Sequence, residues 1–288
     1  MRVEAVIINN EASIRLGFFF GILLLMALLE LGFPRRAPKI SKFLRWRNNL
    51  ALVVLNTLIL RLLFPAALVG LTLFVNDSGW GLFNYYQLPL AFTLFASLVI
   101  LDFVIYLQHV MVHAVPLFWR VHRVHHADLD YDVTTGTRFH PLEIVLSMLV
   151  KFAAVVLIGP PLLAVIVFEV LLNALAMFNH SNLKLPSSLD RGLRLFIVTP
   201  DMHRVHHSIY HDEANSNFGF NLSLWDRLFG TYIAQPRDGH ENMQIGIDDY
   251  QKENQVARLP GILLLPFIGK LNAYAINRRE WKTSPTED

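Results

Sequence analysis

Four apolar stretches limit what this chain can fold into, because each approaches or exceeds the roughly 20 residues with which a helix crosses a bilayer. They cover residues 17–33, 50–75, 88–110 and 142–178. The chain is 53% hydrophobic and only 17% charged, which is unusual for a soluble protein. We therefore predict an all-α, multi-pass integral membrane protein, of a bacterial inner membrane or an ER-type membrane.

The fourth stretch is too long for one span. Gly159-Pro160-Pro161 interrupts it, and proline both removes a backbone donor and clashes with the preceding turn. We therefore predict a helical hairpin here. The predicted membrane helices are residues 17–33, 50–75, 88–110, 142–158 and 161–179.

A basic loop between the first two spans orients the chain. It contains Arg35, Arg36, Lys39, Lys42, Arg45 and Arg47. Loops rich in Lys and Arg stay on the cytoplasmic side, so the segments that follow the third span and the hairpin are expected there too. We predict one membrane domain over residues 1–288, in which 111–141 and 180–288 form a cytoplasmic helical cap, with Trp225, Phe229 and Tyr232 at the membrane interface.

Several classes of function are excluded by composition. The chain has no cysteine, which rules out disulfides, thiolate zinc sites, Cys-ligated iron–sulfur clusters and a cysteine nucleophile. Any metal must therefore bind nitrogen or oxygen. The net charge is only +2 and no basic run alternates with aromatic residues, so no nucleic-acid partner is expected.

Eight histidines form three tight clusters. His109 and His113 lie four residues apart at the end of the third span, which places their rings on one helix face about 6 Å apart. The pentapeptide 122–126, His-Arg-Val-His-His, recurs residue for residue at 203–207. In a helix, the three histidines of each pentapeptide form a tripod of ligands.

The neighbours of the pentapeptides support helices at both places. Pro116 and the pair Thr199-Pro200 are typical of helix starts, with Thr199 as the cap. The intervening Arg123 and Arg204 point away from the tripods and are expected in water. Eight imidazoles exceed the needs of one ion, since zinc takes four ligands and non-haem iron about six. Two metal ions are therefore predicted, and imidazole alone does not choose among Fe, Zn, Cu and Ni.

This pattern, His-x3-His followed by two His-x2-His-His boxes, resembles the sterol desaturase and fatty acid hydroxylase superfamily of integral membrane di-iron enzymes. The resemblance covers about residues 88–232 and includes Asp102, segment 137–143 and segment 224–232. It implies O2-dependent hydroxylation or desaturation of a membrane lipid of sterol or fatty-acyl type. It also implies two Fe ions, with Zn as a substitute, held by His109, His113, His122, His125, His126, His203, His206 and His207.

Electrons for such a reaction must come from a separate donor, because the chain lacks a Gly-x-Gly-x-x-Gly fingerprint and a haem motif. A cytochrome b5-like protein or a ferredoxin with its reductase fits this role. The residues choose neither the lipid, nor between hydroxylation and desaturation, nor an oligomeric state.

Further site residues are predicted around the clusters. His180 ends the hairpin, where the superfamily often places another histidine, and is a candidate ninth ligand. Glu169 and Asn173 precede it on the same helix face, and a membrane-embedded Glu is a functional candidate. Asp102 lies on the stripe of His109, where a carboxylate can orient a ligand through its imidazole N–H, or simply face water. His140, next to a proline, is expected to cap a helix or act as a lid rather than bind metal.

The alternative function is a membrane protein that binds or transports zinc or iron without oxygenase activity. It requires ligands along a route between both membrane faces, whereas the clusters are predicted on one side. A zinc hydrolase is disfavoured because the chain has no His-Glu-x-x-His box.

Overall fold

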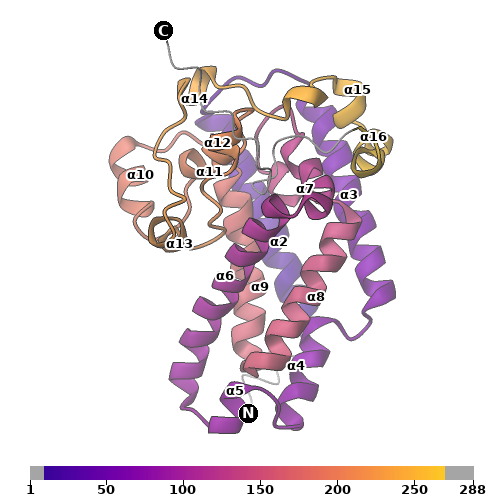
Figure 1. Cartoon of the computed structure of the whole chain (residues 1–288), viewed down its shortest axis with the longest axis vertical. Helices are drawn as coiled ribbons and strands as arrows, with labels where there is room; N and C mark the ends of the chain where they lie inside the picture. The colour runs from indigo at the N-terminus through magenta and orange to yellow at the C-terminus, as the bar shows by residue number, and fades with distance from the viewer. Residues whose placement is uncertain (1–9, 270–288) are drawn as a thin grey trace.

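The computed structural model of this chain describes residues 10–269. Long helices form an elongated bundle, and short helices and loops form a cap over one end of it (Figure 1). Within residues 10–269 the extended pairings are isolated bridges, and no strand is formed. The predicted all-α fold is therefore confirmed.

Five helical segments are long and apolar enough to cross a bilayer, which makes the chain an integral membrane protein. They are α2 (Glu11–Gly32), α3 (Lys42–Leu63) with its continuation α4 (Ala67–Asp77) and α5 (Leu82–Tyr86), α6 (Leu90–Ala114), α8 (Pro141–Ile158) and α9 (Leu162–Asn179).

The second predicted span differs from the single helix expected over 50–75. It begins earlier, at Lys42, and it breaks between Leu63 and Ala67. Pro65 lies at the break, where it cannot continue the backbone hydrogen bonds of α3. Ala67 also has a positive φ of 49°, so the chain changes direction before α4 begins.

The hairpin of α8 and α9 agrees with the predicted arms to within one residue. Gly159 ends α8 in the left-handed conformation, with φ of 65°. A Cβ atom at this position would lie 2.5 Å from the carbonyl oxygen of Trp80, so the turn packs tightly against the α4–α5 loop. Glycine therefore satisfies both the backbone conformation and the close approach.

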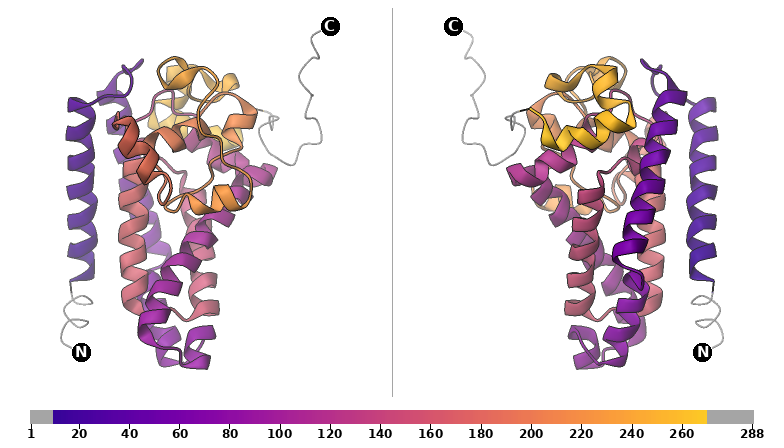
Figure 2. Two further views of the ribbon diagram at one scale, coloured as in Figure 1. Left: turned by 90° about the vertical axis from the view of Figure 1, so that its left-hand side faces the viewer. Right: turned by 90° about the vertical axis from the view of Figure 1, so that its right-hand side faces the viewer.

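The bundle packs around α9. Leu101 and Ile105 of α6, Ala154 of α8 and Phe168 of α9 form one buried apolar cluster. On the other side of α9, α2 stands as an outer helix (Figure 2). Only 11% of the apolar window of α2 is buried within the protein, as expected for a helix that faces lipid over most of its surface.

The cap is built from the chain between α6 and α8 and from the chain after α9. Its elements are α7 (Pro116–His126), η1 (Thr135–Thr137), α10 (Ser187–Leu193), α11 (Pro200–His206), α12 (His211–Ala214), α13 (Leu224–Leu228), α14 (Gly239–Asn242), η2 (Asp248–Tyr250), α15 (Glu253–Val256), α16 (Leu259–Leu264) and η3 (Leu265–Phe267). Residues 270–288, also predicted to belong to the cap, lie outside the described residues.

The predicted basic loop is on the cap side of the bundle, and part of it is bound by the cap. Arg35 forms ion pairs with Asp201 and Glu241. Arg36 is buried and donates to the carbonyl oxygen of Met243. These two arginines therefore hold cap segments as well as adding positive charge to this side.

A buried ion pair joins α3 to the cap. Arg45 is 1% exposed and donates to both carboxylate oxygens of Asp128 at 2.7 Å, and also to Asp132. Burial alone would raise the pKa of the Asp128 carboxyl, but the guanidinium groups of Arg45 and Arg138 lower it to about 2. Asp128 therefore stays ionised at any pH near neutrality.

We expect Arg45→Ala to destabilise the protein by about 3–5 kcal/mol, because two buried carboxylates lose the guanidinium that they share. The measurement is thermal unfolding in detergent. Arg47→Ala is the matched control, since Arg47 is exposed on the same helix. Both substitutions make α3 more apolar, so the comparison isolates the effect of the ion pair. An unchanged unfolding temperature for Arg45→Ala would show that the pair is not needed.

Candidate metal centre

The predicted histidine clusters come together where the bundle meets the cap. His109 and His113 lie near the end of α6, and His180 is the C-cap residue of α9. The first pentapeptide ends α7, and the second occupies α11 and its C-cap position. Both predicted helix starts are confirmed: α7 begins at Pro116, and the Thr199 hydroxyl caps α11 by accepting from the Met202 N–H.

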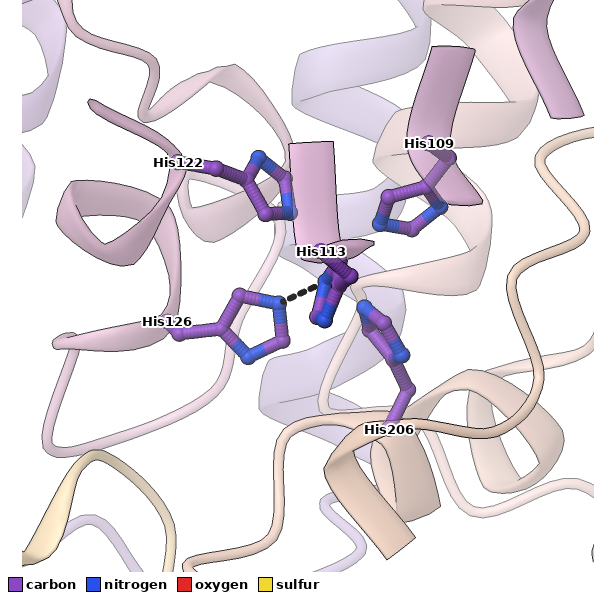
Figure 3. A group of neighbouring side chains, drawn as sticks. All are labelled: His109, His113, His122, His126 and His206. Atoms are coloured by element: carbon purple, nitrogen blue, oxygen red, sulfur yellow. Dashed lines mark hydrogen bonds between the residues drawn. The ribbon is translucent and has the colours of Figure 1, made fainter. Parts of the chain in front are cut away.

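The nine histidines form two groups, in each of which the candidate ligand atoms lie within 4.8 Å of one another. The five-histidine group is His109, His113, His122, His126 and His206 (Figure 3). The four-histidine group is His125, His180, His203 and His207. Each of the nine side chains is at most 5% exposed, so both groups are closed to bulk water.

Each pentapeptide is divided between the two groups. The first gives His122 and His126 to the five-histidine group and His125 to the other, whereas the second gives only His206 to the five-histidine group. This differs from the tripod predicted for each pentapeptide. Successive residues of a helix are rotated by about 100°, so the histidines at the fourth and fifth positions point to different sides.

Hydrogen bonds to Nδ1 determine which ring nitrogen is free. Nδ1 of His109, His180 and His206 lies 2.7–2.8 Å from a backbone carbonyl oxygen. Because a carbonyl only accepts, these Nδ1 atoms carry the proton and Nε2 keeps its lone pair. Nε2 of His109, His122, His206 and His207 is buried without a hydrogen-bond partner, as expected for nitrogens that bind a metal ion.

Close contacts between Nε2 atoms also fit metal ions. Nε2 of His180 lies 3.0 Å from that of His125 and 3.1 Å from that of His203, and the His113–His126 distance is 3.1 Å. Nitrogen ligands about 2.1 Å from one ion and at right angles to each other are about 3.0 Å apart. The residues therefore fit one ion in each group.

Burial favours the neutral, metal-binding form of six of these imidazoles. Burial, with repulsion from neighbouring histidines, lowers the pKa well below its usual value for His125, His126, His203, His206 and His207. Burial likewise lowers the pKa of His180 to about 3. Ligation requires deprotonated nitrogen, so these rings are ready to bind cations at neutral pH.

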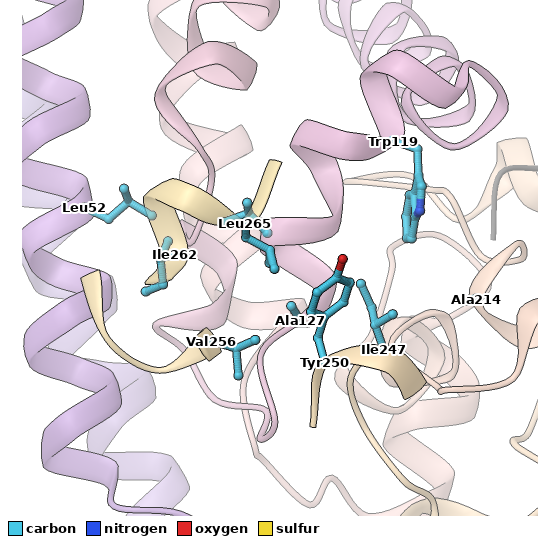
Figure 4. Packing of buried hydrophobic residues seen from close by; sticks show 10 residues of the cluster. Leu52, Trp119, Ala127, Ala214, Ile247, Tyr250, Val256, Ile262 and Leu265 are labelled. Carbon is cyan, nitrogen blue, oxygen red and sulfur yellow. The ribbon is translucent and has the colours of Figure 1, made fainter. Parts of the chain in front are cut away.

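Aromatic side chains surround the two groups. The ring of Phe139 stacks on His125 with centroids 4.6 Å apart, and Phe218 packs 5.1 Å from His113. Trp119 lies 4.9 Å from His113 and also belongs to the apolar core of the cap (Figure 4). The centre is thus enclosed by apolar walls that exclude water.

Asp102 does not form the predicted contact with an imidazole. It lies seven residues before His109, about 10 Å lower along α6, which is too far to reach the ring. Its carboxylate instead accepts from the indole N–H of Trp225 at 2.8 Å and from the Leu222 N–H at 3.2 Å. Trp225, expected at the membrane interface, is therefore buried against α6.

Glu169 and Asn173 lie within the bundle, away from both groups. Glu169 is eleven residues before His180, about 16 Å along α9, and it pairs with Lys151 at 3.0 Å and Arg15 at 3.1 Å. Asn173 donates its side-chain N–H to the Glu169 carbonyl. The polar stripe on α9 is thus satisfied by helix-to-helix pairing and does not extend to the histidines.

The carboxylate that does touch an imidazole was missed at the sequence level. Glu143, in the first turn of α8, lies 2.6 Å from Nδ1 of His122 and is 4% exposed. Its signal was its place in the motif at 137–143, three residues after His140. His140 itself caps α8, as one of its two predicted roles states, because its Nδ1 accepts from the Leu142 N–H.

The pentapeptide arginines are not solvated, contrary to the prediction. Arg123 and Arg204 are both at most 1% exposed. Arg123 donates to the carbonyl oxygens of Leu265 and Ile268, and Arg204 to Asp201 and the Ser181 carbonyl. They point away from the metal groups, but into other parts of the cap.

Comparison with known proteins finds similarity to a family of hydroxylases and monooxygenases. Residues 93–231 match the family model described as fatty acid hydroxylase. An ornithine lipid hydroxylase of Rhizobium tropici is 31% identical over 55% of this chain and 47% of its own length. The human alkylglycerol monooxygenase is 30% identical over 54% of this chain and 34% of its own. A methylsterol monooxygenase of Arabidopsis thaliana is 29% identical over 46% of this chain and 49% of its own.

The chain spans about half or less of the length of these relatives. No solved structure gives a significant match. The matched region nevertheless includes the histidines of both groups, together with Asp102, Glu143 and segment 224–231. Over residues 93–231 the chain therefore belongs to the sterol desaturase and fatty acid hydroxylase superfamily.

Proposed function

We propose that this chain is an O2-dependent di-iron oxidoreductase that hydroxylates or desaturates a C–H bond of a membrane lipid. The observation that carries the proposal is the set of nine buried imidazoles in two groups, with unpartnered Nε2 atoms, at one end of a membrane bundle. Two such groups in a dry site suit paired metal ions.

The ligand assignment follows the two groups. The five-histidine group holds one ion and the four-histidine group holds the other, so His180 joins the eight box histidines. Iron is proposed rather than zinc, because zinc has no redox chemistry. When bound, the iron pair supplies the electron transfers with O2 that oxidation of a C–H bond requires.

The protein's own residues hold, orient and isolate this centre. Backbone carbonyls and Glu143 fix the imidazoles through Nδ1, which is how metal-bound histidines are commonly oriented. The rings of Phe139, Phe218 and Trp119 keep water away. Electrons come from a separate protein, for which a cytochrome b5-like protein or a ferredoxin with its reductase is proposed.

A lipid substrate is supported by the position of the centre. His180 immediately follows the last residue of α9, so the centre lies where an apolar helix leaves the hydrocarbon core. The relatives include an ornithine lipid hydroxylase and an alkylglycerol monooxygenase, which favours a polar membrane lipid. We place the cap in the cytoplasm, because two exposed basic residues lie on the cap side: Lys39 in the loop and Arg47 near the start of α3.

The alternative, metal transport, has no observation in its favour. It requires ligands along the bundle, but both candidate groups found among residues 10–269 lie at the cap end. The charged cluster lower in the bundle consists of Glu169 and two cations, Lys151 and Arg15, each of which pairs with Glu169.

His180→Ala tests the ligand assignment. Removing one of four nitrogens should lower the bound metal from about two ions to about one ion per chain, measured by elemental analysis of purified protein loaded with Fe2+ under anaerobic conditions. His140→Ala is the control, because His140 is a buried histidine that caps α8 outside both groups. Two ions retained in His180→Ala would remove His180 from the ligand set.

The activity itself is tested by comparing the lipids of cells that express the wild-type chain with a redox partner and of cells that express His206→Ala at the same level. The wild type should add one oxygen atom to a membrane lipid or remove two hydrogens from it, as seen by mass spectrometry, and His206→Ala should not. His140→Ala should retain the change. Identical lipid profiles for the wild type and His206→Ala would contradict an oxygenase.

A further inference from the structure

One segment of the cap supplies the hydrogen-bond partners of three histidines of the five-histidine group. We call residues 215–231 the clasp loop. Nδ1 of His109 lies 2.8 Å from the Phe218 carbonyl oxygen, and Nδ1 of His206 lies 2.7 Å from the Ser216 carbonyl oxygen. Nδ1 of His113 lies 3.2 Å from the side-chain oxygen of Asn215, on the same loop. The ring orientation of three candidate ligands, from two helices, therefore depends on the positions of oxygen atoms in this loop.

Asp226 determines the orientation of the peptide that faces His109. Its carboxylate accepts from the N–H groups of Phe218 and Gly219, both at 2.7 Å, and it is fully buried. In a trans peptide the N–H and C=O point in opposite directions. Because Asp226 holds the Gly219 N–H on one side, the Phe218 carbonyl is directed to the other side, toward His109.

The peptide that faces His206 is held through Thr231. The Asn217 N–H, which shares a peptide with the Ser216 carbonyl, donates to the Thr231 carbonyl at 2.8 Å. Thr231 is in turn held by Asp226: its hydroxyl donates to the Asp226 carboxylate at 2.7 Å, and its backbone N–H donates to the main-chain carbonyl of Asp226 at 2.8 Å. Asp226 therefore supports both peptides that orient the imidazoles.

The clasp loop closes tightly on Asp226. A Cβ atom at Gly219 would lie 2.6 Å from the Asp226 carboxylate, so only glycine allows this approach. Asn217 has a positive φ of 49°, and its side chain bridges the Met202 and Ile233 carbonyls. This conformation is uncommon outside glycine, although Asn tolerates it better than most residues.

Helix α6, which carries two of the candidate ligands, also forms hydrogen bonds with the clasp loop. On α6, Asp102 accepts from Trp225, and the Tyr106 hydroxyl lies 3.1 Å from that of Thr231. Asp102 and Tyr106 share a helix face with His109 and His113. The loop and α6 therefore form one hydrogen-bonded unit behind the five-histidine group.

The four-histidine group depends less on this loop. Nδ1 of His180 is satisfied by the Ala176 carbonyl of its own helix, at 2.8 Å. His203 lies beside the backbone of Asn217, which is held by its own side chain as well as by Thr231. Loss of the Asp226 carboxylate should thus weaken metal binding mainly in the five-histidine group.

We propose that Asp226 is a positioning residue for the five-histidine group: it aims the carbonyls of Ser216 and Phe218 so that His206 and His109 stay protonated on Nδ1 and direct Nε2 to the ion. This inference rests on the proposed metal centre, because it assumes that the five-histidine group binds an ion. It gives a role to Asp226, which contacts no histidine in this structure and binds two backbone N–H groups instead. Asp226 directly follows Trp225, which donates to Asp102.

The test is metal binding by Asp226→Asn in the full-length protein. Asparagine offers one acceptor where two N–H groups need one each, so the loop should lose its fixed orientation. Apoprotein in detergent is titrated with Zn2+, and we expect one of two binding steps to weaken by about 10- to 100-fold, while the other stays close to that of the wild type. In the His180→Ala background, the weakened step should be the one that remains.

Asp130→Asn is the matched control. Asp130 is 2% exposed and also accepts from two successive backbone N–H groups, those of Lys39 and Ile40 at 2.8 and 2.9 Å. Both N–H groups bind the same Asp130 oxygen, which asparagine still offers, and Asp130 lies in a different part of the cap. The control therefore removes a buried carboxylate charge without releasing the loop behind the histidines, and both Zn2+ steps should match the wild type.

Three results would count against the inference. Wild-type affinities for both steps in Asp226→Asn would show that Asp226 does not position the ligands. Equal weakening of both steps in Asp226→Asn and in Asp130→Asn would show a general loss of stability instead. If the wild type binds no ion at all, the proposed metal centre fails, and this inference fails with it.

Discussion

An imidazole has two nitrogens, and the protein must satisfy one of them before the other can face an ion. Most of the cap's construction follows from this constraint. Backbone carbonyls of α9 and of the clasp loop, together with Glu143, occupy Nδ1 of four rings. Helix ends and loops expose free carbonyls, whereas helix interiors do not, so a centre of this kind has to be built where long helices end.

Buried arginines in and near the cap must likewise have their N–H groups satisfied. Arg45, Arg123, Arg138 and Arg204 are among the largest fully buried side chains. Each donates to carbonyls or carboxylates of segments distant in the chain, as Arg138 does to the Val124 and Val256 carbonyls. Buried charge is stable only when its hydrogen bonds are made, so these arginines tie α3, the pentapeptides and the C-terminal helices to one arrangement.

Periodic features were predictable from the sequence, and features that depend on tertiary contacts were not. The hairpin at Gly159, the helix starts at Pro116 and Thr199, and the clustering of the histidines all follow from local rules. The partner of Asp102 was predicted incorrectly, because helical spacing specifies a shared face but not the distance to another segment. Burial of Arg123 could not be foreseen either, since it depends on the carbonyls of Leu265 and Ile268, more than a hundred residues away.

The division of the pentapeptides makes the centre nearly symmetric. Each pentapeptide gives two rings to one group and one ring to the other, so together they supply three nitrogens to each side. The remaining ligands break this balance, because α6 adds two rings to one group and α9 adds one to the other. The unequal size of the two histidine groups therefore originates in the membrane helices, and the duplicated motif alone would make the groups equal.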